Sequence, residues 1–267
     1  MSSSRFPACL AATLKHEGGF STNRADPGNW TGGKVGKGEL KGTKKGISAA
    51  AYPNLDIKNL TDAQIAQIYE AEYWRVVRGD DLPAGIDLST FDYGVNSGNS
   101  RSIKTLQKAA GAAQDGKMGR ATLAAVRAKQ PTKLIQAIND ARLGFLQGLA
   151  SWKTFGKGWG TRVGDIRARA LLMAGAGARE LDAAAERDTR LAAKDTKSSG
   201  NMAVAGTGIG AGTTSGALTT DFFSWSTIGG LAVAVAVLIA CSIVLARRAN
   251  AREEMADATL KVKAEIR

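Results

Sequence analysis

The stretch that decides the fold is "LKHEGGFSTNRADPGNW", Leu14–Trp30. Before it, apolar residues recur four positions apart, at Phe6, Leu10 and Leu14. This spacing predicts a helix with one apolar stripe, and at about 100° per residue Glu17 falls on the same stripe. Gly18 and Gly19 then end the helix. The sequence therefore predicts a carboxyl group on the core-facing side of a helix end, beside a glycine-rich loop.

Two interpretations of Glu17 follow from this position. A partly buried carboxyl group suits a general acid, because burial favours the protonated form. A glutamate at a helix end also commonly forms a salt bridge, here with Lys15 or Arg24. The residue pattern alone does not choose between the two interpretations.

The neighbouring His16 is the only histidine of the chain. A zinc site with several histidines is therefore excluded, and no HExxH motif or Cys/His cluster exists, so we expect no metal and no cofactor. His16 and Cys9 lie seven residues apart and could pair as imidazole and thiol, but the apolar neighbours of Cys9 favour a packed thiol. We expect His16 to support the turn that follows the helix.

The charge of the chain points to an anionic partner. Its net charge is +12, and residues 1–180 hold 26 Lys and Arg against 15 Asp and Glu. A basic globular part favours a bacterial wall polymer, lipid head groups or nucleic acid. Because no RNA-binding aromatic motif or recognition helix accompanies the charge, we expect no nucleic-acid partner.

The C-terminal part has the composition of a membrane anchor. Phe222–Ala246 contains no charged residue and is long enough to cross a hydrocarbon layer of ~30 Å, and two arginines follow it. The uncharged stretch Thr196–Thr220 is rich in Gly, Ser, Thr and Ala, which predicts a flexible tether. We predict a charged helix and linker at 181–221, a single transmembrane segment at 222–248 and a basic cytoplasmic tail at 249–267. A buried soluble helix is the alternative to the membrane segment.

The glycine-rich loop carries a resemblance to a known family. "HEGGFSTNRADPGNWTGG" followed by "KGTKKGIS" resembles the signature of glycoside hydrolase family 108, the N-acetylmuramidases of phage endolysins and secretion-activating wall hydrolases. The family pattern matches Glu17–Gly19, Asp26–Gly28 and Thr43–Ser48. A stretch of Asn29–Gly42 replaces the shorter link of many members, so either Thr31 or Thr43 takes the threonine position.

The second half of the globular part resembles the predicted peptidoglycan-binding region of the same family. "FDYGVNSG" at 91–98, "DGKMGRAT" at 115–122 and "FGKGWGTRV" at 155–163 carry this resemblance. It extends from about Ala8 to Ala170 and implies a catalytic region at 1–90 and a helical binding region at 91–180. Asp92, Tyr93 and Asn96 are candidate substrate-binding residues, although Asp92 and Asn96 could equally cap helices or brace a turn.

Periodicity and resemblance together predict a mainly α, lysozyme-like fold with a small Gly-rich hairpin and one C-terminal transmembrane helix. The resemblance implies hydrolysis of the β-1,4 bond after N-acetylmuramic acid in peptidoglycan, with Glu17 as general acid. We expect Asp26 to orient water or stabilise the oxocarbenium-like transition state, and the threonine to hold the water. The alternatives are a lytic transglycosylase that uses the same glutamate and a non-catalytic wall-binding anchor.

The positive-inside rule places the tail in the cytoplasm and the globular part on the periplasmic, peptidoglycan side of the inner membrane. The N-terminus has no signal-peptide pattern. Two routes therefore stay open. In the first, the N-terminal part inserts outward. In the second, the enzyme is stored inside until a membrane partner such as a holin opens the membrane.

Overall fold

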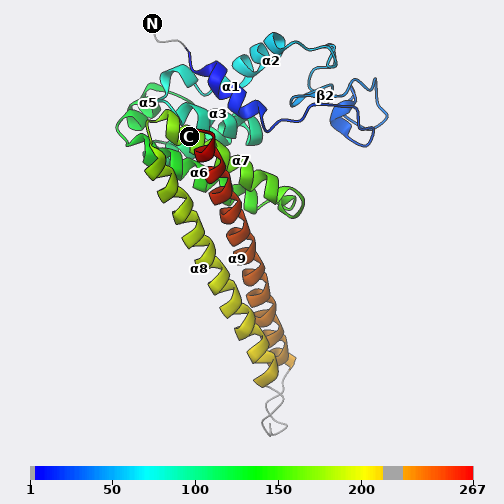
Figure 1. The fold of residues 1–267 in the computed structure, drawn as a ribbon. Coiled ribbons are helices and arrows are strands. Elements are labelled where there is room, and N and C mark those ends of the chain that lie inside the picture. The colour runs from blue at the N-terminus through cyan, green and yellow to red at the C-terminus, as the bar shows by residue number, and fades with distance from the viewer. Residues whose placement is uncertain (1–3, 213–224, 267) are drawn as a thin grey trace. The chain divides into compact units, whose positions relative to one another are not determined.

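The computed structural model describes residues 4–212 and 225–266 (Figure 1). In chain order its α-helices are α1 (Phe6–Leu14), α2 (Asp62–Tyr69), α3 (Ile86–Ser97), α4 (Asn99–Ala110), α5 (Arg120–Arg127), α6 (Pro131–Gln147), α7 (Trp152–Met173), α8 (Ala178–Gly212) and α9 (Trp225–Glu265). Short 3-10 or π turns are η1 (Pro27–Asn29), η2 (Glu70–Trp74) and η3 (Gly79–Asp81). The predicted mainly α fold is confirmed.

The predicted Gly-rich hairpin is present as a three-stranded antiparallel sheet. Its strands are β1 (Phe20–Ser21), β2 (Thr43–Lys44) and β3 (Ile47–Ser48), in the order β1-β2-β3. Ser21 pairs with Thr43, and Thr43 pairs with Ser48 on the other side. Lys45 and Gly46 form the turn between β2 and β3 with φ of 46° and 75°, a left-handed conformation in which glycine is favoured.

The chain divides into two compact units. The first contains residues 1–142 and 169–176, and the second contains 143–168 and 177–267. The predicted boundary between a catalytic region at 1–90 and a binding region at 91–180 falls inside α3, and it stays a prediction.

Unit 1 is organised around α3, whose residues 86–94 are all buried. Phe6 of α1, Trp74 of η2 and Phe91 of α3 form an aromatic cluster with ring centroids 5.5 to 6.0 Å apart. Phe6 and Leu10, two members of the predicted apolar stripe, are buried in this unit. Burial of these large side chains fixes α1 against the centre of the unit.

A capping box begins α2. Thr61 and Gln64 form both of its hydrogen bonds, which satisfies free N–H groups at the start of the helix. After Tyr69 the helix continues as the π turn η2, in which the Arg75 N–H donates to the Glu70 carbonyl. The wider turn rotates the last residues of the helix relative to α2.

In unit 2, α8 and α9 run side by side as two long antiparallel helices (Figure 1). Their ends near the chain's C-terminus pack with α6 and α7 around a core of buried side chains. This core contains Leu143, Leu146, Trp152, Val163, Ala251 and Met255. The last residues of the chain are therefore part of a folded core.

The structure corrects the prediction of a flexible tether at Thr196–Thr220. The helix α8 continues through Gly212, because packing against α9 outweighs the low helix propensity of its glycines. The remaining tether residues 213–220, together with Phe222 and Phe223, lie outside the described residues. Within the described part of the chain, α9 is long and apolar enough to cross a membrane.

Candidate active site

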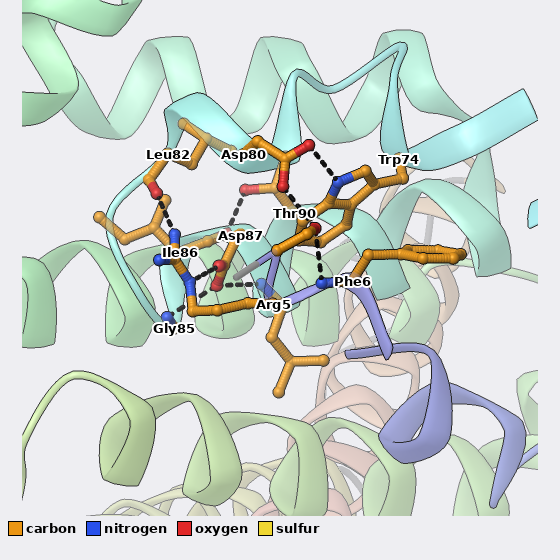
Figure 2. Close-up of polar contacts among 11 residues, drawn as sticks. Arg5, Phe6, Trp74, Asp80, Leu82, Gly85, Ile86, Asp87 and Thr90 are labelled. Carbon is orange, nitrogen blue, oxygen red and sulfur yellow. Dashed lines mark hydrogen bonds and ion pairs between the residues drawn. The ribbon is translucent and has the colours of Figure 1, made fainter. Parts of the chain in front are cut away.

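The position of Glu17 depends on how α1 is attached to α3. Arg5 donates from Nε to Asp87 Oδ2 at 2.5 Å and from Nη2 to the Leu82 carbonyl at 2.6 Å (Figure 2). The other carboxylate oxygen of the buried Asp87 accepts the N–H groups of Gly85 and Leu88, both at 2.7 Å. These charge-assisted bonds fix the start of α1, and the rigid helix transmits that position to its other end.

Glu17 lies one turn beyond the end of α1 and is half-buried. Its N–H donates to the Leu14 carbonyl at 3.2 Å, and the following Gly18 carbonyl accepts the Lys45 N–H at 3.0 Å. The end of α1 is therefore hydrogen-bonded to the turn between β2 and β3. Gly18 and Gly19, which the sequence predicts to end the helix, lie beyond its last residue, Leu14; both are exposed and connect the turn to β1. Their supporting role stays a prediction.

Gly46, in the same turn, contacts the carboxyl group of Glu17. A Cβ atom at Gly46 would lie 3.1 Å from Glu17 Oε2 and 2.8 Å from Tyr69 Oη. The Tyr69 hydroxyl donates to the Lys45 carbonyl at 2.8 Å, which holds the turn against α2. The missing side chain of Gly46 thus leaves room for the glutamate beside a tyrosine.

Two tyrosines, Tyr69 and Tyr73, belong to the surroundings of Glu17. The rings of Tyr69 and Tyr73 lie with centroids 5.6 Å apart. Burial raises the pKa of Tyr73, and the nearby charges of Glu72 and Glu17 raise it further. The Tyr73 hydroxyl therefore stays protonated at neutral pH and remains a hydrogen-bond donor. The helical stripe identified Tyr69 as buried, but a stripe does not indicate which loop will contact it.

Asp26 has a structural function at the start of η1. Its Oδ1 accepts the Gly28 N–H at 2.9 Å, so that it caps this short turn, and the residue is exposed. An exposed carboxylate that caps a turn remains free to accept a proton or a hydrogen bond from a ligand through its other oxygen. Its catalytic function stays a prediction.

The two candidate threonines lie in different elements. Thr43 lies in the central strand β2 and pairs with Ser21, which follows Glu17 by four residues in the sequence. Thr31 instead accepts the Glu39 N–H at 2.9 Å with its Oγ1 and braces the loop between η1 and β2. Within the stretch Asn29–Gly42, Thr31 therefore stabilises the loop itself.

Asp92 and Tyr93 lie in the buried part of α3. Asp92 forms an ion pair with Arg142 at 2.6 Å in which both side chains are 0% exposed. The Arg142 guanidinium also lies 5.5 Å from the centre of the Tyr93 ring. This arrangement favours the alternative in which Asp92 braces the fold. The contact of Asp92 and Tyr93 with substrate stays a prediction, and the burial of both residues does not favour it.

Asn96 is half-buried near the end of α3, where its side-chain oxygen accepts a hydrogen bond from Ser97 Oγ at 2.9 Å. Directly after it, the start of α4 lines a cavity of about 520 Å³. Arg101, Lys104 and Lys108 give this cavity a positive charge. A polar, basic hollow of this kind suits an anionic polymer.

The remaining candidates near the helix end are not nucleophiles. Cys9 is fully buried, and burial raises the pKa of its thiol well above the usual range, so the thiolate needed for an attack does not form. His16 is half-buried and precedes Glu17 in the turn after α1, and its supporting role stays a prediction. Among the residues that the structure describes, no group of three or more His, Cys, Asp or Glu is placed to hold a metal ion.

Two family models match the chain. Residues 10–98 match the family described as Glycosyl hydrolase 108, and residues 101–164 match the domain described as Predicted Peptidoglycan domain. The chain belongs to the glycosyl hydrolase 108 family, which confirms the resemblance of its motifs.

Among solved structures, the chain is similar to SagA of Brucella abortus. The two share 39% sequence identity with a TM-score of 0.55, over 65% of this chain and 97% of that chain. No curated protein matches the chain. The protein is a glycoside hydrolase that acts on peptidoglycan.

Proposed function

We propose that the protein is an N-acetylmuramidase that cleaves the β-1,4 bond between N-acetylmuramic acid and N-acetylglucosamine, with Glu17 as general acid. The observation that carries this proposal is the position of Glu17. It lies in the family motif, half-buried at the end of α1, with its carboxylate against Gly46. A carboxyl group that is partly shielded from water and held by rigid elements can donate a proton to the glycosidic oxygen.

The other polar groups take supporting functions. Asp26 stabilises the positive charge that develops on the sugar ring or orients the attacking water, and Thr43 holds that water. The basic cavity beside Asn96 binds the peptidoglycan strand through its acidic groups, since Arg101 and Lys104 line it. Salt should weaken this attraction, because exposed charges are screened.

The Glu17→Gln variant tests the function of the glutamate. The amide keeps the shape of the side chain but has no proton to donate, so we expect a loss of about 10²–10⁴-fold in the digestion of purified peptidoglycan. The matched control is Glu39→Gln, which makes the same change at a glutamate whose side chain is 77% exposed. Wild-type activity of folded Glu17→Gln would refute the assignment.

A lytic transglycosylase would use the same glutamate but close the sugar onto itself. Mass spectrometry of the digestion products separates the two reactions. Hydrolysis leaves a reducing N-acetylmuramic acid end, whereas the transglycosylase leaves an anhydro product that is lighter by one water.

We further propose that the apolar half of α9 attaches the protein to the inner membrane and that the enzyme acts on the peptidoglycan side. The length and composition of the helix support the attachment. The cytoplasmic position of residues 249–267 and a holin or another membrane partner stay predictions from the sequence.

A further inference from the structure

The C-terminal part of α9 is held firmly to α7 and α8. Arg167 of α7 forms an ion pair with Asp188 of α8, and both side chains are 0% exposed. The same guanidinium donates to Thr259 Oγ1 of α9 at 3.0 Å, and Arg252 of α9 lies 3.5 Å from Asp188. Removing α9 would take away Thr259 and Arg252, two polar partners of this buried pair.

Glycines of α7 bring the two helices into close contact. A Cβ atom at Gly164 would lie only 2.7 Å from the Met255 backbone, and one at Gly160 would lie 3.1 Å from Glu254 Cβ. Met255 itself is 0% exposed. A single membrane span that carries residues 249–267 to the opposite side would have to break this packing.

The register of α8 and α9 shows where charge disappears from both helices. Ser199 Oγ donates to the Ser242 carbonyl at 2.8 Å, which places these two residues at the same level. Lys197 is the last charged residue of α8, and Arg247 is the first one after the apolar stretch of α9. Lys197 lies two residues before Ser199, and Arg247 lies five residues after Ser242. The charged part therefore ends within about one helical turn of the same level on both helices.

Beyond this level both helices lack charge. Asp221 is the only charged residue between Ser198 and Ala246. The small residues of α8 allow close helix packing, and the bond between Ser199 and the backbone of α9 is of the kind that joins helices within lipid. Val204 of α8 is 71% exposed and Val233 of α9 is 64% exposed, so apolar side chains point outward from both helices.

The start of α7 lies at the same boundary and has the composition of a head-group region. A cavity of about 450 Å³ is lined by Lys153 and Lys157 of α7 and Arg247 of α9, with Glu254 as the one acidic side chain. Phe155, which is 55% exposed, lies with its ring centroid 5.7 Å from that of Trp159. Aromatic rings beside basic residues are typical of the interface between lipid and water.

We propose that the uncharged half of α8 and the apolar half of α9 enter the membrane together as a helical hairpin. Residues 1–197 and 247–267 then stay on the same side, so this hairpin replaces the predicted arrangement in which residues 249–267 lie in the cytoplasm opposite the globular part. The basic cavity of α7 and α9 faces anionic lipid head groups. This inference rests on the proposed membrane attachment but not on the assignment of Glu17. A single span differs from it, because a span places the two ends of the chain on opposite sides.

The position of the two ends can be measured in the full chain. Tags are added at both termini, and sealed inner-membrane vesicles of one orientation are divided into two samples. Protease is added to the first sample, and the second is extracted with alkaline carbonate to test for membrane insertion. The hairpin predicts that both tags are digested together or protected together. Digestion of one tag alone would overturn it in favour of a single span, and release of the protein by carbonate would overturn membrane insertion itself.

Charge substitutions locate the lipid boundary independently. In the hairpin Val204→Arg places an arginine in lipid, so we expect the inserted form with both tags on one side to decrease about 10- to 100-fold. Ala193→Arg is the matched control, because Ala193 is also exposed but lies on the charged half of α8, and it should leave insertion unchanged. Unchanged insertion of Val204→Arg would show that α8 stays in water and would refute the hairpin.

Discussion

Substitution of Gly46 by alanine tests the geometry around Glu17 without altering any catalytic group. Gly46 has φ of 75°, and a Cβ atom there would lie 2.8 Å from Tyr69 Oη and 3.1 Å from Glu17 Oε2. Both oxygens must move for the methyl group to fit. At 3.1 Å the Glu17 oxygen must move by only a few tenths of an ångström, whereas a displacement of about 1 Å can cost on the order of 10²-fold in rate. We therefore expect Gly46→Ala to lose about 3- to 10-fold in activity.

The matched control is Gly36→Ala, in the loop between η1 and β2. Gly36 has nearly the same φ, 76°, but a Cβ atom there has nothing within 4 Å. Both variants therefore incur the same left-handed backbone cost of about 1 kcal/mol, which lowers the melting temperature by about 2–4 °C. Only Gly46→Ala adds the contact with Glu17.

The assay is the clearing of purified peptidoglycan, normalised to the folded fraction from circular dichroism. We expect Gly36→Ala to keep nearly full activity per folded molecule, whereas the activity of Gly46→Ala per folded molecule should fall. Equal activity of the two variants would refute the placement of the catalytic carboxyl group beside Gly46.

Three further variants separate structural from catalytic functions. Asp26→Asn keeps a side chain that caps turns equally well, so the melting temperature should stay unchanged while activity falls less than in Glu17→Gln; unaltered activity would remove Asp26 from the mechanism. Asp92→Asn leaves Arg142 in the core without its carboxylate and should destabilise the fold by about 3–5 kcal/mol, measured by denaturant unfolding, with activity per folded molecule retained. A drop in that activity would instead support the predicted contact with substrate. Because burial raises the pKa of Cys9, its thiol stays protonated at pH 8, and a maleimide reagent should modify it only after unfolding, as peptide mass mapping would detect.

Local sequence signals predicted much of the fold. The four-residue spacing of Phe6, Leu10 and Leu14 identified α1. The starts of α2 and α6 also carry local signals, the capping pair Thr61–Gln64 and Pro131 at the first helical position. The continuation of α8 through Gly212 was not predictable in this way. Its composition has low helix propensity, and the stabilisation comes from α9, which lies far away in the sequence.

In the candidate site, too, local signals predicted some features, whereas contacts between distant parts of the chain were not predictable. The motif and the apolar stripe predicted Glu17 at the end of a helix that Gly18 and Gly19 terminate, whereas α1 ends at Leu14 and Glu17 lies in the turn that follows. They did not indicate that Gly46 and Tyr69 would contact its surroundings, because such contacts depend on the pairing of β1 with β2. Asp92 looked like a polar residue available to a ligand, but its partner Arg142 is 50 residues further along the chain. Pairs of residues this far apart in the chain produce no periodic pattern from which a single sequence could predict them.

The core of unit 2 affects the order in which the protein can be completed during synthesis. Leu143 and Val163, which are 1% and 0% exposed, share this core with Ala251 and Met255 near the end of the chain. The ribosome must therefore release the residues up to Met255 before the core closes, whereas the first 142 residues are available to fold earlier. A shortened chain that ends before α9, such as one made to obtain a soluble enzyme, would leave Leu143 and Val163 without their partners and expose an apolar surface prone to aggregation.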